Sequence, residues 1–184
     1  TRIPRSKYTP LQFFRLGTSG SIHDTIAMDT CLISAYAYGL DCLASYYPVN
    51  EALNQFENNL DLEDIPFYVT RANETLMQFF RPHFPEGVTL TIPGFYHPQG
   101  RQTRIQNEKL LRVRKLFNSS SRLGNITNME METSAIYGMS KLLGHQALSL
   151  NAILANRVDG TFSKDPHGAT DKLIRYVLEQ IVKH

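Results

Sequence analysis

The chain has 184 residues, of which 42% are hydrophobic and 20% charged, a composition typical of one globular domain. Its 19 basic and 17 acidic residues are interspersed and leave a formal net charge of +2, so no basic block indicates a nucleic-acid or membrane-surface partner. Cys31 and Cys42 fit neither a zinc-site spacing nor a disulfide framework, and no signal peptide or apolar run of about 20 residues is visible. We therefore expect a cytoplasmic protein with reduced thiols and no metal site.

The elements expected along the chain alternate between strands and helices. Hydrophobic patterns and breakers predict strands at residues 12–16, 30–35, 88–92 and 147–155, and helices at 50–56, 73–80, 107–117 and 133–143. A terminal helix carries an apolar stripe formed by Leu173, Ile174, Val177, Leu178, Ile181 and Val182. This alternation predicts a layered α/β fold with a mostly parallel or mixed sheet.

The segment RLGTSG, from Arg15 to Gly20, is suited to binding an oxyanion. We expect a buried strand to end here in a tight glycine turn, where small residues expose backbone N–H groups and two hydroxyls. Arg15 adds a planar fork of donors, although the lysine of a P-loop is absent. The alternative interpretation is a simple turn whose arginine forms an ion pair.

The segment GFYHPQGR, at residues 94–101, is suited to a planar heterocycle. Gln99 can accept and donate hydrogen bonds, Arg101 donates two residues later, and Phe95 or Tyr96 offers a flat surface. A base with alternating carbonyl and imide groups requires this combination. Proline and glycine around polar side chains are also typical of an ordinary surface loop.

The segment NMEME, at residues 128–132, is suited to a sugar. Alternate residues of a strand share a face, so Glu130 and Glu132 are expected to point together and accept from the cis-diol of a ribose. Met131 then lies on the opposite face unless the strand bends. An acidic helix N-terminus explains the same carboxylates, because the helix dipole favours them there.

The segment ILANR ends a predicted strand in the polar pair Asn156 and Arg157. The carboxyl edge of a sheet is where α/β proteins place their ligands. Arg157 is equally compatible with a surface cation.

Together and in this order, the four segments resemble the uridine phosphorylase branch of the nucleoside phosphorylase family. RLGTSG is similar to its phosphate strand, FYHPQGR to its base loop, NMEMETSA to its ribose motif and ILANR to its late strand end. The resemblance runs from Phe13 to the C-terminus. It implies a three-layer αβα fold around a mixed, mostly parallel twisted sheet, and a pentosyltransferase that converts uridine and phosphate to uracil and ribose 1-phosphate. It also implies a homo-oligomer, a dimer or a hexamer of dimers, with shared active sites.

At the phosphate and sugar end, the resemblance implies that Arg15 and Thr18 contact phosphate. Met131 packs on the sugar, Glu132 accepts from its hydroxyls, and Glu130 supports that contact. Inorganic phosphate is then the co-substrate, and no organic cofactor is implied.

At the base end, the resemblance implies that Gln99 and Arg101 hold the pyrimidine edge while Phe95 borders the ring. Gly20 lines the passage between phosphate and base, and Arg157 supports the base loop. Arg15, Arg101 and Glu132 are thus the expected catalytic groups, because cations near the departing base and anions near the anomeric carbon favour a sugar with oxocarbenium character.

The late strand end bears on the choice of base. Purine-cleaving relatives carry an aspartate there to protonate the leaving group, whereas this chain has Asn156, which cannot deliver a proton. Asp159, three residues on, keeps a purine role open. The alternatives are therefore a purine-nucleoside phosphorylase, a nucleoside hydrolase of the same fold, and a non-catalytic nucleoside-binding domain.

The chain also departs from the family pattern upstream of RLGTSG. The family's glycine-arginine phosphate loop, its second glycine-rich turn, and an arginine and a histidine lent to a neighbouring subunit have no counterpart here. We expect residues 1–184 to be one phosphorylase-like domain that is incomplete at its N-terminus.

Overall fold

The computed structural model describes residues 7–47, 65–104 and 111–183. The strands are β1 (Gln12–Ser21), β2 (Cys31–Gly39), β3 (Tyr68–Arg71), β4 (Glu86–Thr91), β5 (Ser120–Ser121), β6 (Gly124–Glu130), β7 (Gln146–Asn156) and β8 (Thr161–Phe162). The helices are the 3₁₀ turn η1 (Leu43–Ser45) and α1 (Glu74–Phe80), α2 (Leu111–Arg114), α3 (Thr133–Leu142) and α4 (Pro166–Lys183). The α/β class expected from the sequence is confirmed.

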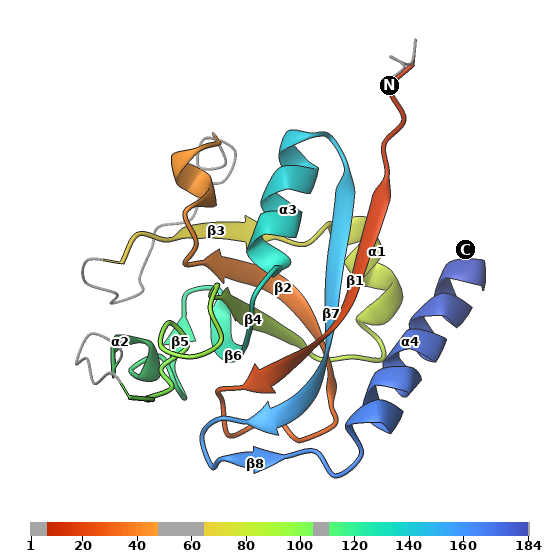
Figure 1. The fold of residues 1–184 in the computed structure, drawn as a ribbon. Helices are drawn as coiled ribbons and strands as arrows, with labels where there is room; N and C mark the ends of the chain where they lie inside the picture. The colour runs from red at the N-terminus through yellow and green to blue at the C-terminus, as the bar shows by residue number, and fades with distance from the viewer. Residues whose placement is uncertain (1–6, 48–64, 105–110, 184) are drawn as a thin grey trace.

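The strands form one mixed sheet in the order β3-β2-β4-β6-β1-β7-β8, with β5 paired to β6. The two longest pairings, β1 with β7 and β2 with β4, are parallel. An additional antiparallel pairing joins β2 to β7, so that β2, β4, β6, β1 and β7 close into a ring of five strands (Figure 1). The pattern of alternating elements did not predict this closure.

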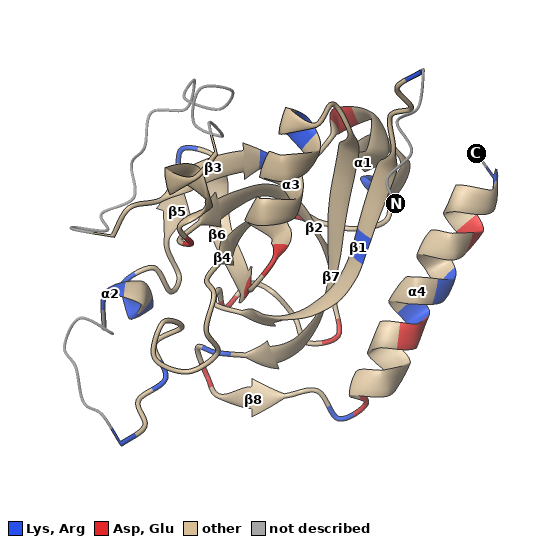
Figure 2. Ribbon diagram, turned by 45° about the horizontal axis from the view of Figure 1, so that its top comes forward, with Lys and Arg blue, Asp and Glu red and all other residues tan. Residues whose placement is uncertain are grey.

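Helices cover the sheet through two apolar clusters. The larger cluster joins α1, α3 and α4 to β2 and β7 through side chains such as Phe80, Tyr137 and Leu173. The second cluster joins the α2 region to β4 and β6 through Val113 and Leu90. Figure 2 shows basic and acidic residues interspersed over the fold, for instance along α4. None of the described helices has the length and apolarity needed to cross a bilayer.

The predicted strand at 12–16 is confirmed, but the glycine turn after it is wrong, and the strand is only partly buried. β1 does not stop at Leu16 but continues to Ser21, because its backbone pairs with β7 along the whole length. The small residues are accommodated inside the strand, and the irregularity is a register shift between Ser19 and Gly20. Much of β1 is also partly exposed, and the Phe13 side chain retains 40% of its accessible surface.

The helix predictions vary in accuracy. α1 is confirmed, with the Asn73 side chain as its N-cap acceptor for the N–H of Leu76. α3 is confirmed and is followed by Gly144 in the left-handed region, at a φ of 68°. The predicted helix at 107–117 is helical only over α2 within the described residues, and the one at 50–56 lies outside them.

Candidate active site

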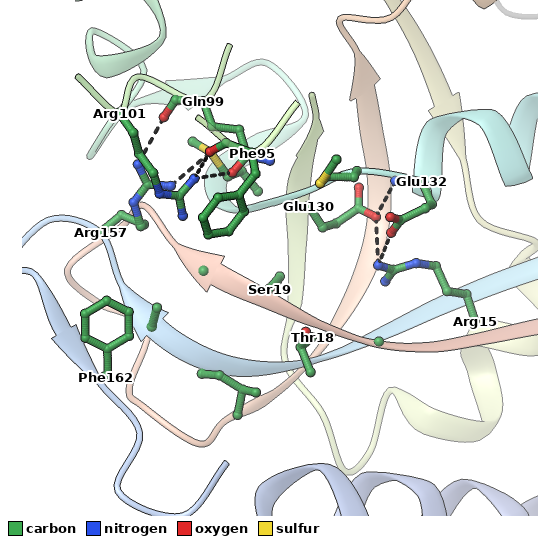
Figure 3. Close-up of a pocket in the computed structure, with 16 residues that line it drawn as sticks. Arg15, Thr18, Ser19, Phe95, Gln99, Arg101, Glu130, Glu132, Arg157 and Phe162 are labelled. Carbon is green, nitrogen blue, oxygen red and sulfur yellow. Dashed lines mark hydrogen bonds and ion pairs between the residues drawn. The ribbon is translucent and has the colours of Figure 1, made fainter. Parts of the chain in front are cut away.

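The candidate site is a cavity of about 510 Å³ at the end of β1, between the loop after β4, the β6–α3 junction and the end of β7 (Figure 3). Side chains from segments far apart in the chain converge on it. All ten residues to which the resemblance assigns a place in phosphate, base or sugar binding line this one cavity, namely Arg15, Thr18, Gly20, Phe95, Gln99, Arg101, Glu130, Met131, Glu132 and Arg157.

One end of the cavity holds an arginine between two carboxylates. Arg15 Nη2 lies 2.5 Å from Glu132 Oε2 and 3.1 Å from Glu130 Oε2. The Arg15 side chain is largely buried, Glu130 is buried, and the Glu132 side chain keeps 54% of its accessible surface. Glu132 is therefore the carboxylate of this group that is available to a ligand.

Glu130 is fixed by the start of α3. Its Oε2 accepts the backbone N–H groups of Glu132 and Thr133, both at 2.9 Å, and its Oε1 accepts from Thr91 at 2.6 Å. The helix N-terminus interpretation is confirmed for Glu130, which also lines the cavity. β6 ends at Glu130 and the chain bends, which brings Met131 to the cavity as well.

Arg15 is held from behind by β7 and needs the glycine that follows it. Its Nη1 donates to Asn151 Oδ1 at 2.8 Å and to Ser149 Oγ at 3.3 Å. A Cβ on Gly17 would lie 2.6 Å from Arg15 Cζ, closer than real contacts allow. Gly17 is thus required so that the guanidinium can lie across the strand.

The opposite end of the cavity is formed by the loop after β4. The Arg101 guanidinium stacks over the Phe95 ring, with Cζ 3.7 Å from the centroid, and also donates to the Phe95 carbonyl. Arg101 Nη1 donates to Gln99 Oε1 at 2.7 Å, while Gln99 Nε2 donates to the Ile92 carbonyl at 3.2 Å. Gln99 is buried and both of its amide atoms have protein partners.

Arg157 joins the end of β7 to this loop. Its Nη2 donates to the Gln99 carbonyl at 3.0 Å, and its aliphatic stem lies against Gly20, where a Cβ would be 3.1 Å from Cγ. Burial, together with the nearby charges of Arg101 and Arg114, lowers the pKa of Arg157 to about 10. The structure therefore contradicts the alternative of a simple surface cation.

Six further residues line the cavity and were not singled out in the sequence: Gly17, Ser19, Met129, Leu154, Ala155 and Phe162. The first five adjoin or fall within the motifs. Phe162 lies on the two-residue strand β8, which pairs with the end of β7 opposite Ala155. Such a short strand carries no periodic signal, so the sequence offered no means of finding Phe162.

The two polar residues discussed for purine chemistry lie outside the cavity lining. Asn156 Oδ1 accepts from the Val158 N–H at 2.9 Å and so shapes the turn after β7. Asp159 accepts from both the N–H and the hydroxyl of Thr161, and these bonds lower the pKa of its carboxyl. Among the described residues, no group of three or more histidine, cysteine, aspartate or glutamate side chains is placed to hold a metal.

Comparison with known proteins adds an independent finding. The sequence model of the family described as "Phosphorylase superfamily" matches residues 6–184. A uridine phosphorylase of Haemophilus influenzae is 28% identical over 162 residues, which cover 87% of this chain and 58% of that protein. The chain thus spans less than two thirds of the length of this relative.

Solved structures agree in fold. A Trypanosoma brucei nucleoside phosphorylase, described as showing uridine phosphorylase activity, superposes with a TM-score of 0.76 at 27% identity. The match covers 94% of this chain and 64% of that one. A Schistosoma mansoni uridine phosphorylase in complex with thymine shares the fold at 23% identity, with a TM-score of 0.66 and coverage of 95% and 62%. With the family match spanning nearly every residue and the fold in agreement, the chain belongs to the phosphorylase superfamily.

Proposed function

We propose that the protein to which this chain belongs is a pyrimidine-nucleoside phosphorylase that converts uridine and inorganic phosphate to uracil and ribose 1-phosphate. One observation carries the proposal: Arg15, Arg101 and Glu132, which are far apart in sequence, line a single cavity. That cavity offers a cation for an anion, a stacked arginine for a planar ring and an open carboxylate for a sugar. The likeness to uridine phosphorylases supports the same substrates.

In the proposed reaction, a phosphate oxygen attacks the anomeric carbon as the bond to the base nitrogen breaks. The phosphate occupies the end of the cavity near Arg15 and Thr18, which both line it. Arg15 already meets two carboxylates, so it is a partly neutralised cation that orients the anion rather than a free charge. Positioning of the two reactants together supplies much of the rate enhancement.

The electron pair of the broken bond passes into the ring of the base. Arg101 lies at this end, and its guanidinium stabilises charge that develops on a uracil carbonyl. Burial leaves the charge of Arg101 incompletely solvated before the base departs, and this lowers the pKa of Arg101. Phe95, under the guanidinium, and Gln99, behind it, keep this donor in place.

The sugar is proposed to lie against the β6–α3 junction. The exposed carboxylate of Glu132 accepts hydrogen bonds from ribose hydroxyls, Met131 packs on the ring, and buried Glu130 fixes the backbone beneath them. Two carboxylates beside the anomeric carbon also favour the positive charge of an oxocarbenium-like transition state.

The environment of the late strand end favours pyrimidines over purines. A purine leaving group is helped by a proton donor, and the two candidates are unsuited to that task. Asn156 has no acidic proton and its oxygen is used in a turn, while hydrogen bonds hold the pKa of Asp159 below its usual range. Departure of uracil needs no such donor when Arg101 stabilises its carbonyl.

The proposal includes three further features. Inorganic phosphate is the co-substrate, and no metal or organic cofactor takes part. The protein is a homo-oligomer with shared active sites, a dimer or a hexamer of dimers, as the resemblance implies. It works in the cytoplasm, in keeping with two cysteines that are both free thiols.

The test is release of uracil from uridine by the whole protein, measured with and without phosphate. We expect release only with phosphate, together with ribose 1-phosphate as the second product. Release of uracil and free ribose without phosphate would instead identify a hydrolase. Tight uridine binding without turnover would identify a non-catalytic binding domain.

A further inference from the structure

Each of the five strands that close into a ring contributes a buried polar side chain to one hydrogen-bonded path. These side chains come from β1, β6, β4, β2 and β7, and we call them the buried ring: Ser19, Asn128, Thr89, Ser34 and Asn151. Apolar residues would fill such buried positions without the cost of removing polar groups from water. Packing alone therefore does not explain why the buried ring is polar.

Hydrogen bonds connect the buried ring to Arg15. Arg15 Nη1 donates to Asn151 Oδ1 at 2.8 Å, and Asn151 Nδ2 donates to Ser34 Oγ at 2.9 Å. Ser34 Oγ lies 2.6 Å from Thr89 Oγ1. From Thr89, bonds of 2.9 Å continue to Asn128 Oδ1 and from Asn128 Nδ2 to Ser19 Oγ. Both ends of this path, Arg15 and Ser19, lie on β1 and line the cavity.

The donors and acceptors along the path give it one direction. A guanidinium can only donate, so Asn151 must present its oxygen to Arg15 and its amide group to Ser34. Thr89 spends its single hydrogen on the oxygen of Asn128, so Ser34 must donate to Thr89. Every bond then runs from Arg15 toward Ser19.

The direction decides what Ser19 can do. Its oxygen accepts from Asn128, and its own hydrogen meets no acceptor among the residues that the structure describes. Since Ser19 lines the cavity, that hydrogen is a donor available to a ligand there. The two ends of the path thus present donors on one face of β1, four positions apart, with Gly17 between them on the same face.

We infer that the buried ring is a positioning device for the anion site: it locks Asn151 so that Arg15 is held in place, and it locks Asn128 so that Ser19 donates into the cavity. The inference rests on the proposed function for the identity of the anion as phosphate. Thr89, which touches neither Arg15 nor the cavity, is the link that joins the Asn151 half of the path to the Asn128 half. Without the Thr89 hydroxyl, Ser34 loses the acceptor of its hydrogen. The Asn128 oxygen then keeps only the Thr127 hydroxyl, at 2.9 Å, as a side-chain donor, so that the Asn128 amide is held less firmly.

The decisive variant is Thr89→Val, which removes the hydroxyl and nearly preserves the volume. Thr89→Ser restores the hydroxyl. Thr70→Val is the matched control, because Thr70 is a buried strand threonine whose hydroxyl donates to the Ala37 carbonyl, outside the path and away from the cavity. Ser34→Ala breaks the path at the next link and replaces Thr89→Val if that variant fails to fold.

The readouts are binding of inorganic phosphate to the nucleoside-free whole protein by calorimetry, and the KM values for phosphate and uridine. For Thr89→Val we expect phosphate Kd and KM to rise about three- to tenfold, with the KM for uridine within about twofold of wild type. Thr89→Ser and Thr70→Val should bind phosphate like wild type, and thermal unfolding of each variant shows how much of any loss is due to lower stability.

Equal phosphate binding by Thr89→Val and Thr70→Val would overturn the inference, as would matched rises in the KM values for phosphate and uridine. These results are separable from failure of the proposed function. If the wild type neither binds phosphate nor needs it to release uracil, the proposed function falls and the inference falls with it. If the wild type does both and Thr89→Val is unchanged, only the buried ring loses its role.

Discussion

Arg157 Nη2 donates to the backbone carbonyl of Gln99 at 3.0 Å, across 58 positions of sequence. This bond joins the end of β7 to the loop that carries Arg101. The loop is therefore held by the sheet as well as by contacts among its own residues. Arg114 makes a second tie from the α2 helix, donating to the Gly100 carbonyl at 2.9 Å. Two arginines, Arg157 and Arg114, therefore hold this end of the cavity in place from two different elements.

Replacing Arg101 by alanine is expected to remove the donor at the departing base. We predict a loss in kcat/KM for uridine of about 100-fold or more, the size typical of losing a transition-state donor. Thermal unfolding should show only a small change, since Arg101 is not part of the apolar core. Arg104→Ala, an exposed arginine three positions on and outside the cavity lining, is the control. Wild-type phosphorolysis by Arg101→Ala would refute the base-loop assignment.

Replacing Glu132 by alanine is expected to affect ribosides more than 2′-deoxyribosides. The carboxylate is half exposed, so stability should change little, but an acceptor for the sugar hydroxyls is lost. We predict that kcat/KM for uridine falls about tenfold further than that for 2′-deoxyuridine. Glu132→Gln keeps one acceptor oxygen without the charge and separates this role from the ion pair with Arg15. Equal losses on the two nucleosides would exclude a ribose-hydroxyl role.

Phe162 retains 75% of its accessible surface although it lines the cavity. An aromatic ring at the edge of a site contributes to affinity when a bound ligand covers its exposed surface. Phe162→Ala should therefore raise the KM for uridine about three- to tenfold while leaving thermal stability and the KM for phosphate unchanged. Val158→Ala, an exposed position in the adjoining turn, is the control. An unchanged uridine KM in Phe162→Ala would remove this residue from the binding site.

Asn73 caps α1, which packs on the core far from the cavity. Asn73→Ala leaves the Leu76 N–H without its acceptor and should lower the free energy of unfolding by about 1 kcal/mol, or Tm by roughly 2–4 °C. Asn73→Asp keeps an acceptor and should stay near wild type. The activity per folded molecule is expected to be unchanged. A loss of activity at constant folded fraction would mean that α1 contributes to the site.

The sequence predicted the residues of the cavity more completely than it predicted the fold. Short motifs identified ten residues that line the cavity, because residue types such as Arg101 and Glu132 reflect ligand chemistry that local sequence preserves. The extent of β1 was missed, since glycines at 17 and 20 resemble a turn unless the pairing with β7 is known. The roles of the ten residues remain predictions.

Long-range pairing explains the rest of what the sequence did not reveal. β2 meets β7 through residues such as Cys31 and Ala152, which are more than a hundred positions apart, and no local pattern encodes that contact. Polar residues inside strands, such as Ser34 and Thr89, break the apolar runs and carry no apparent meaning until the closed sheet brings them together. Phe162 enters the cavity only because β8 folds back on β7.

The central claim is that an anion, a planar base and a sugar meet in one cavity. It is tested most directly by a crystal structure of the whole protein with uridine and sulfate, an unreactive tetrahedral anion. We predict sulfate beside Arg15 and Thr18, the uracil edge at Arg101, and the ribose hydroxyls on Glu132. Uridine bound elsewhere, or bound here with its base at Arg15 and its sugar away from Glu132, would contradict the claim.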